Sequence, residues 1–363
     1  MPEAPVTSAA VYSAIPTVQV DGQLNEKVTA QLLAMQMTEQ EGGMSNLELR
    51  FSNFGAFAGG LADQVFEDGA ILKLGAQLIV YAGLVTSPTE IFRGQITALE
   101  GVFPAGSPPE LFVLAEDALQ GARMKRRTKS WDSPTLSSLI SDVAAGLNLT
   151  PSITGLDTPL DAEVQFNESD LAFLRRLLAR YDADLQITAT TLYAAPRSQT
   201  QRNNPIQLDL NSQLRHVRVL ADLAHQASQV TTTGWDFNQG QTFSATSQTT
   251  SLGPGAGQTG ASCISQAMKS RSEHLAQYAT LTQADAQSLV DAEFAQRSRR
   301  FVVARGVAEG NPGLRAGSYV TLGGLGPRFS NTYYTTATVH RFDIDRGYET
   351  EFTAECAYLG AAS

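Results

Sequence analysis

Charged side chains are scarce in this sequence of 363 residues, at 17% of the total, where about a quarter is usual. Acidic residues outnumber basic ones by 36 to 26, which gives a formal net charge of −10. A surface that binds nucleic acid needs basic patches, and the sequence offers one dense cluster, from Arg123 to Lys129. We interpret that cluster as a solvated linker between domains, with a docking role as the alternative. The charge balance argues against nucleic-acid specificity.

Side chains that bind metals or take part in redox chemistry are also few. The two cysteines, Cys263 and Cys356, form no CxxC pair, and the four histidines are scattered. The spacing of metal ligands is absent, so we predict no metal site and no cofactor. Two free thiols suit a protein made in the cytoplasm better than a disulfide does, and the disulfide stays open as the alternative.

Long apolar runs and catalytic motifs are missing as well. No run reaches membrane-spanning length, and the first residues lack the regions of a secretory signal. There is no G-x-S-x-G, no H-E-x-x-H and no P-loop. Paired carboxylates could serve glycoside hydrolysis, and the neighbouring ones are Asp157, Asp161, Glu163, Glu168 and Asp170. Because Glu168 and Asp170 lie at an expected helix start, where acids favour the dipole, we predict no catalytic residue and no enzyme.

What the first third of the sequence does contain is β-strand signal. Alternating or apolar segments predict strands at 11–20, 47–51, 71–74, 77–84, 90–103 and 110–115. Residues 26–38 fit either a strand or a helix. Residues 54–66 are apolar and rich in glycine, and we predict a loop with a short helix there. Together, residues 11–120 indicate a small antiparallel barrel or sandwich.

The middle of the chain carries two helix patterns. Ser133 and Pro134 suit the N-cap and the first helical position, and apolar residues then recur at helical spacing. A second helix is predicted from about 167–169 to Tyr181, with its leucines on one stripe. A short hairpin is expected at 185–193. This stretch therefore predicts a compact α+β unit.

The last part of the chain returns to β-strand signal. Strands are indicated within 206–235, and we predict a long loop at 241–262, which is rich in Ser, Thr, Gly and Gln. A helix capped by Thr282 is predicted over 282–300. Strands are then predicted at 301–308, 319–322, 333–342 and 348–357.

One segment of the middle unit carries a resemblance to a known family. Residues 165–178 read QFNESDLAFLRRLL, which resembles the Q-x-N-E-S-D-x-x-F-L-x-R-L signature of the phage late control protein D and VgrG family. Residues 231–236 resemble its V-x-G-W-D segment, and His340 matches its V-x-H position. The resemblance extends in order over roughly residues 11–358. A lone histidine in a strand is usually structural, so we expect His340 at a packing or subunit contact.

The resemblance implies an α+β fold that is mainly β. It consists of two related antiparallel β-barrel, tube-like domains with an inserted helix-containing α+β domain. The expected ranges are 1–125 for part of the first barrel, 126–197 for the insert and 198–363 for the second barrel. Strands near 206–235 could return to the first barrel. A weak internal repeat, in which residues 75–97 and 317–339 share a similar layout, agrees with two related barrels.

For function, the resemblance implies the central baseplate hub of a contractile phage tail or contractile injection system. The hub would be a homotrimer whose six barrels adapt a six-fold inner tube to a three-fold spike and form part of the channel. Its partners would be itself, the inner tube protein, a separate spike protein and other baseplate proteins, with no direct membrane insertion. It would assemble in the cytoplasm into a virion or injection particle. The alternative is a cell-wall or carbohydrate-binding module of a tail or spike complex.

Overall fold

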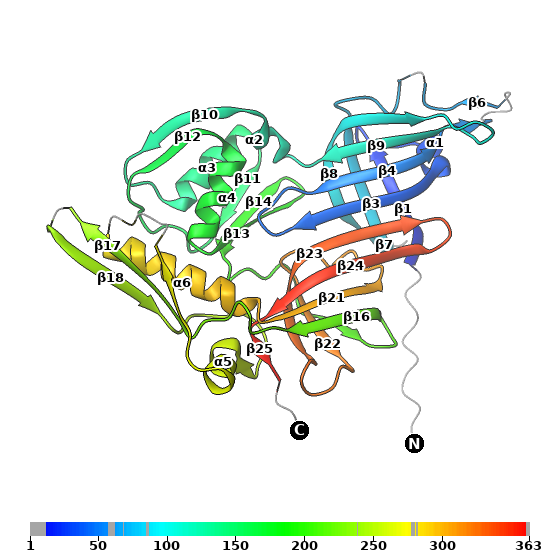
Figure 1. The fold of residues 1–363 in the computed structure, drawn as a ribbon. Coiled ribbons are helices and arrows are strands. Elements are labelled where there is room, and N and C mark those ends of the chain that lie inside the picture. The colour runs from blue at the N-terminus through cyan, green and yellow to red at the C-terminus, as the bar shows by residue number, and fades with distance from the viewer. Residues whose placement is uncertain are drawn as a thin grey trace.

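The chain forms two β modules, an inserted α+β unit and a lateral wing, as Figure 1 shows. The computed structural model describes residues 12–56, 62–67, 69–84, 87–237, 239–276, 280 and 282–360. The predicted fold class, mainly β with large antiparallel sheets and a helix-containing insert, is confirmed. The expected loop at 54–66 lies partly outside the described residues, and its described ends pair as two short strands.

The first β module holds the elements up to residue 116. These are β1 (Tyr12–Val20), β2 (Gln23–Leu24), α1 (Glu26–Gln31), β3 (Leu32–Gln40), β4 (Asn46–Ser52), β5 (Phe54–Gly55), β6 (Asp63–Gln64), β7 (Gln77–Leu84), β8 (Ser87–Val102) and β9 (Glu110–Glu116). The ambiguous segment 26–38 therefore contains both a helical turn and a strand. Residues 71–74, predicted as a strand, form none.

The inserted unit packs three helices against short strands. Its elements are α2 (Gln120–Met124), β10 (Arg126–Trp131), α3 (Leu136–Gly146), β11 (Thr150–Ile153), β12 (Glu163–Ser169), α4 (Asp170–Arg180), β13 (Ala183–Thr188) and β14 (Thr191–Pro196). The prediction of Ser133 as N-cap is wrong, because Thr135 caps α3 and forms a capping box with Ser138. Ser133 instead has a positive φ of 48° in the preceding turn. The predicted second helix begins as expected, with Ser169 as its cap.

The second β module and the wing share the rest of the chain. The module contains β15 (Ile206–Asp209), β16 (Leu214–Ala221), β21 (Val302–Glu309), β22 (Tyr319–Gly323), β23 (Asn331–Asp343) and β24 (Gly347–Cys356), with β19 (Gln258–Thr259), α5 (Gly260–Ala267) and β25 (Tyr358–Leu359) beside it. The wing is β17 (Gln229–Asp236), β18 (Gln241–Ser247), β20 (Ser272–Leu275) and α6 (Gln283–Arg299), which Thr282 caps as predicted. The long loop expected at 241–262 is thus largely wrong, since it contains β18, β19 and the start of α5.

A single strand path joins the two β modules. The order is β16-β21-β24-β23-β3-β4-β9-β8-β7-β1-β2, and β22 and β15 extend from one end of β23. The joint is the antiparallel pair of β23 with β3, whereas β15 and β16 pair within the second module. Among the residues that the structure describes, this path stays open and closes into no barrel. The two modules lie one above the other in Figure 1, with the insert and the wing to one side.

The weak internal repeat corresponds to two hairpins. Residues 75–97 fall in the β7–β8 hairpin, and residues 317–339 fall in the β22–β23 hairpin. Each begins with a glycine at positive φ, Gly75 at 84° and Gly317 at 87°, a conformation that glycine adopts without steric cost.

Candidate functional site

The broadest feature of the molecule is one outer sheet face that crosses both β modules. Eight strands contribute to it, in the order β16, β21, β24, β23, β3, β4, β9 and β8. Its continuity is visible in the register, where one row of directly opposed residues runs Glu309, Glu349, Arg341, Gln36, Glu48, Leu114 and Ala98. Because side chains alternate along a strand, this row faces away from the two cores. We call this surface the outer face.

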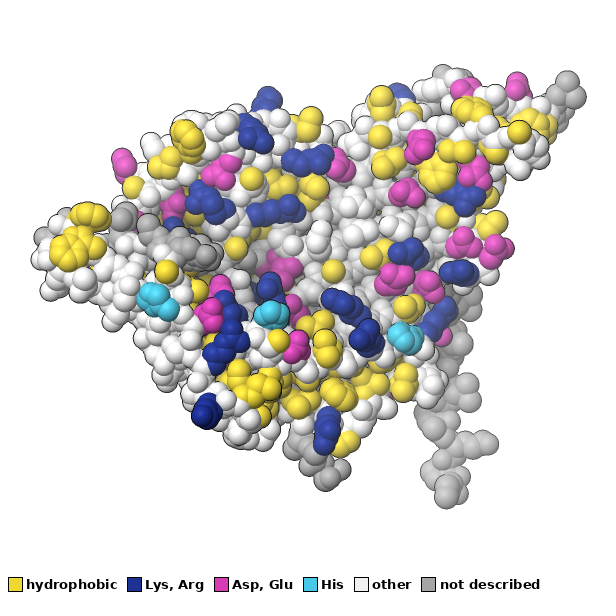
Figure 2. Space-filling view, viewed as in Figure 1, with side chains coloured by type: hydrophobic (Ala, Val, Ile, Leu, Met, Phe, Trp, Pro, Cys, Tyr) yellow, Lys and Arg dark blue, Asp and Glu magenta, His cyan; other side chains and the backbone are white. Residues whose placement is uncertain are grey.

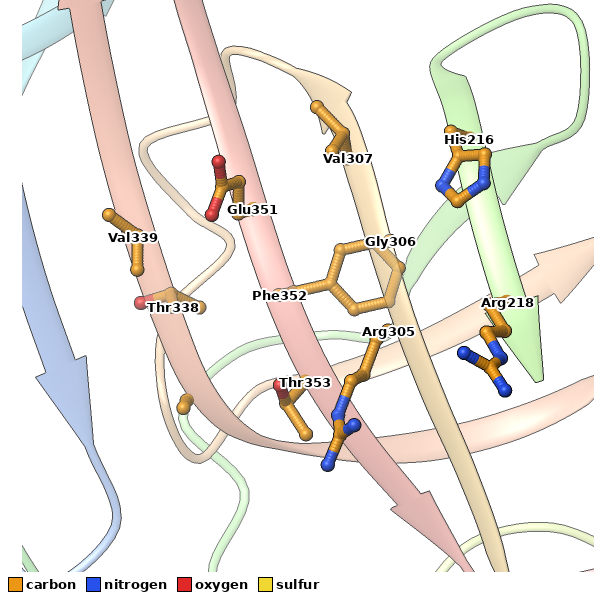
Figure 3. Close-up of a pocket in the computed structure, with 11 residues that line it drawn as sticks. His216, Arg218, Arg305, Gly306, Val307, Thr338, Val339, Glu351, Phe352 and Thr353 are labelled. Atoms are coloured by element: carbon orange, nitrogen blue, oxygen red, sulfur yellow. The ribbon is translucent and has the colours of Figure 1, made fainter. Parts of the chain in front are cut away.

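The outer face is hollowed over the second module. A cavity of about 360 Å³ lies over β16, β21, β24 and β23, with Val307 and Val339 among its lining residues. Figure 3 shows Arg218 and Arg305 on neighbouring strands at one end of this hollow, away from Glu351. A second hollow of about 400 Å³ lies on the same face across the joint between the modules. The outer face therefore has two hollows, one over the second module and one across the joint between the modules.

Both ends of the outer face are open strand edges. In the described part of the chain, β16 pairs with β21 alone, apart from a single bridge between its first residue, Leu214, and Leu210. Residues 96–102 of β8 pair with β9 only, because β7 pairs with the other half of that strand. Open edges present unpaired N–H and C=O groups that can pair with another chain. The outer face is thus bounded by two sites suited to strand pairing.

The two open edges carry opposite charge. Arg218 on β16 lies directly opposite Arg305 on β21, an unfavourable arrangement for two like charges. Among the described residues neither forms an ion pair, and Arg218 is exposed. At the other edge Glu100 on β8 is exposed and likewise without an ion pair in that set. The cationic edge and the acidic edge are complementary to each other.

A buried carboxylate beneath the outer face ties three parts of the chain together. Glu39 at the end of β3 accepts hydrogen bonds from Arg315 Nε at 2.7 Å and from Arg202 Nη1 at 2.7 Å. Arg202 follows the insert and Arg315 precedes β22 in the second module. Burial would raise the pKa of Glu39, but the two guanidinium groups outweigh it and lower the pKa to about 2. We call these three residues the Glu39 cluster.

A second charged group lies two residues further along the chain. Arg197 forms an ion pair with Glu41 and lies 3.0 Å from the ring centroid of Tyr334. Burial has the largest influence on Glu41 and raises its pKa, Arg197 lowers it, and the nearby carboxylates Asp184 and Glu355 raise it, so that the pKa is about 6. Arg197 lies 3.9 Å from Glu355, which Arg300 also approaches at 3.8 Å, so two guanidinium groups share the carboxylates Glu41 and Glu355 here.

His340 lies in the core between the modules. Its Nδ1 is 2.7 Å from the Tyr348 hydroxyl, and its side chain is fully buried. Burial lowers the pKa of His340 to about 3, with Arg315 adding to the effect, so the imidazole is neutral at pH 7. A neutral, fully buried histidine whose Nδ1 contacts a tyrosine hydroxyl is a packing residue, in keeping with its expected structural role, although its Nε2 has no hydrogen-bond partner among the described residues.

Four of the five carboxylates considered for hydrolysis serve as ion-pair and hydrogen-bond partners, and the fifth, Asp157, is exposed. Asp170 at the start of α4 pairs with Arg127, and Glu168 pairs with Arg176 at 2.9 Å. Asp161 accepts a hydrogen bond from the Thr282 hydroxyl at 3.1 Å, which ties the insert to the wing. Glu163 is buried beside Arg176 and Arg180, each at 3.8 Å, and burial raises its pKa. Each of these four carboxylates thus has a structural partner.

The cysteines, the possible metal ligands and the basic cluster form no further site. Cys263 and Cys356 are free thiols, and no group of His, Cys, Asp and Glu in the described residues is arranged to hold a metal ion. None of the helices in that part of the chain is long and apolar enough to cross a membrane. The basic cluster is exposed as predicted, but it lies in α2 and β10 rather than in a linker.

Solved structures share this fold at low sequence identity. A 43 kDa tail protein of prophage MuSo2 from Shewanella oneidensis has a TM-score of 0.66 and 13% identity, over 94% of this chain and 97% of that one. A tail protein from Neisseria meningitidis has a TM-score of 0.64 and 10% identity, over 94% and 96%. An E. coli protein described as a component of the type VI secretion system has a TM-score of 0.56 and 12% identity, over 95% and 79%. The chain therefore has a fold found in tail proteins.

The family is given by a match over most of the sequence. Residues 58–343 match the family described as the Alg8 N-terminal domain, and the chain belongs to that family. The description names a domain and no activity. No curated protein matches the sequence. The resemblance of residues 165–178 predicts a likeness to tail proteins, and the fold has that likeness. The family that matches the sequence is instead described as the Alg8 N-terminal domain.

Sequence reasoning missed the Glu39 cluster and the open edges. Glu39, Arg202 and Arg315 are far apart in the chain, and nothing in the local sequence of the two arginines distinguishes them from surface charges. The one usable signal for Glu39 is its place in an alternating strand, at a position whose neighbours two and four residues earlier are buried methionines.

Proposed function

We propose that this protein is the structural hub of a baseplate, in a contractile phage tail or injection system. The proposal is supported by the fold, which occurs in tail proteins and in a type VI secretion component, and by the family resemblance of residues 165–178. It includes a homotrimer, a junction between a six-fold inner tube and a three-fold spike, and no catalytic activity. It also keeps the division into 1–125, 126–197 and 198–363 as functional parts.

The observation that carries the proposal is the outer face with its two open edges. Its eight strands are all antiparallel to their neighbours, so β16 and β8 run in opposite directions. Copies placed head to tail would therefore join β8 of one to β16 of the next as another antiparallel pair. Such a heterologous contact builds a closed ring when the rotation closes. Three copies with two β modules each would form a six-part ring around a concave, channel-lining face.

Charge complementarity supports the same contact. Arg218 on the β16 edge lacks an ion pair among the described residues, and so does Glu100 on the β8 edge. Bringing the two edges together would place a carboxylate near two like-charged arginines and relieve their repulsion. The edge strands would then be covered rather than exposed.

Sedimentation of the purified chain, alone and with an inner tube protein, tests the proposal. We expect a species with the mass of three chains, alone or when the tube protein is added. Arg218→Glu and Glu100→Arg should each lower trimer affinity by about tenfold, and the double charge swap should restore it. Arg346→Glu, at an exposed arginine in the turn between β23 and β24, serves as the matched control and should change nothing.

Two outcomes would overturn the hub. One is a monomer under all of these conditions. The other is a trimer that none of the edge variants weakens, since association would then use another surface. Binding of a monomer to peptidoglycan in a pull-down would favour the alternative, a cell-wall-binding module.

A further inference from the structure

The strand β10 is unusual because almost none of it is covered. It forms a two-stranded sheet with β12 alone, and every residue from Arg126 to Ser130 is exposed. A strand that covers a core normally buries alternate residues, and only Trp131 does so here, by stacking on Phe173 at 5.0 Å. The backbone edge of β10 away from β12 has no strand partner in the described part of the chain.

This edge is strongly basic in an acidic protein. Five of the seven residues from Arg123 to Lys129 are Lys or Arg, while the whole chain carries a net charge of −10. Arg123 pairs with Glu116, Arg127 with Asp170, and Lys129 loosely with Asp142 at 3.8 Å. Within the described residues Lys125 and Arg126 form no ion pair, and both are exposed.

Large apolar side chains lie beside these cations. Phe166 is 77% exposed and Val164 is 48% exposed, and they point the same way from β12 because they are two residues apart. Met124, just before β10, is 65% exposed. Figure 2 shows Lys and Arg side chains gathered with hydrophobic ones over the inserted unit, where Figure 1 places β10 and β12. Basic residues alone could serve to protect an open edge from pairing, but an exposed phenylalanine beside them does not.

We propose that β10 and β12 form a docking site for an extended acidic segment of a partner protein, which adds as a third strand along the free edge of β10. Main-chain hydrogen bonds to that edge would supply affinity, as in strand addition generally. Carboxylates of the segment would face Lys125 and Arg126, and a long apolar side chain of the segment would reach across β10 to Phe166 on β12. The open peptide edge favours a polypeptide over nucleic acid, which offers no matching row of alternating donors and acceptors.

The probe is a short labelled peptide in which Glu and Val alternate, titrated into the full chain and followed by fluorescence polarisation. We expect saturable binding, together with slowed hydrogen exchange of the amides of residues 126–131. Lys125→Glu combined with Arg126→Glu should weaken binding by at least about tenfold. Phe166→Ser should weaken it by about fivefold, because apolar burial is lost.

The matched control is Lys73→Glu combined with Arg346→Glu. It changes the net charge equally at exposed residues outside the insert, and binding should be unaltered. A peptide of the same sequence, N-methylated at alternate residues so that one row of N–H donors is lost, should bind weakly if it adds as a strand. Equal binding of the methylated peptide would overturn strand addition.

Other outcomes also decide against the proposal. Tighter binding of a single-stranded oligonucleotide than of the acidic peptide would mean that the surface recognises phosphates. Loss of self-association in the Lys125→Glu, Arg126→Glu variant, without peptide binding by the wild type, would mean that the surface contacts a second copy. The hub assignment could fail without affecting any of these measurements.

Discussion

The two β modules differ in how far each depends on the other. The buried core of the first module includes Phe342 and Tyr348, which belong to β23 and β24 of the second module. Among the described residues, the buried core of the second module is drawn from residues 208–356 and takes no side chain from the first. The first module is therefore completed by the end of the chain, whereas the second is complete with its own residues.

Because of this asymmetry, the long β23–β24 hairpin is the element that holds the two β modules together. The end of the hairpin nearest its turn, with residues 337–343 of β23, pairs with β3 and contributes to the first core. The opposite end, with residues 331–334 of β23, pairs with β22 and contributes to the second core. The Glu39 cluster lies where these two parts meet. A hub that transmits force between a tube and a spike would need such a rigid joint between its halves.

The largest effect is expected from breaking the joint itself with Glu39→Gln. The change leaves Arg202 and Arg315 buried without their shared carboxylate, and removing one partner of a buried ion pair is strongly destabilising. We expect the free energy of unfolding to fall by about 4 kcal/mol in urea titrations. The control is Glu48→Gln, an exposed carboxylate on the neighbouring strand, which should cost almost nothing. A loss below about 1 kcal/mol for Glu39→Gln would show that the cluster does not stabilise the joint.

A slightly smaller effect should come from Phe342→Ala. Deleting a buried phenylalanine removes apolar burial and leaves a cavity, at a cost of about 3 kcal/mol. Because Phe342 packs in the first core although it belongs to β23, hydrogen exchange should accelerate in β4 and β9. The matched variant is Phe352→Ala on β24, whose side chain packs in the second core, and exchange should there accelerate in β16 and β21. Identical exchange patterns for the two variants would contradict the asymmetry.

Acid should weaken the joint through the same carboxylate. The pKa of Glu39 is lowered from 4.5 to about 2 in the folded chain, so its stabilisation is present above pH 4.5 and is lost as the pH falls toward 2. By linkage, the stability difference between the wild type and Glu39→Gln should shrink by about 2 kcal/mol from about pH 5.5 to about pH 3. Comparing the two proteins at each pH cancels the opposite contribution of Glu41, whose pKa is raised. A difference that stays constant over this range would show that the carboxylate is not paired in the folded state.

The sequence predicted the individual strands and helices better than it predicted the dependence of the first module on β23 and β24. Alternation located β4, β9 and β24, and the Thr282 cap located α6, because these signals are local. The pairing of β23 with β3 joins residues about three hundred positions apart, and no local pattern encodes it. The α3 cap was misplaced because Ser133 and Thr135 are both good caps, and only the turn geometry decides between them.

The smallest effect is expected from removing one tyrosine hydroxyl, and it compares Tyr348, which packs in the first core, with Tyr333, which packs in the second. Tyr348→Phe removes the hydroxyl that lies 2.7 Å from His340 Nδ1, and a buried hydrogen bond of this kind is worth about 1 kcal/mol. Tyr333→Phe removes a comparable bond, from the Tyr333 hydroxyl to the Phe329 carbonyl at 2.8 Å, inside the second module. Both should lower stability equally in urea, but only Tyr348→Phe should speed hydrogen exchange in the first module, since only Tyr348 packs in that core. If Tyr333→Phe disturbed the first module as much, the two cores would be mutually dependent and the asymmetry would be lost.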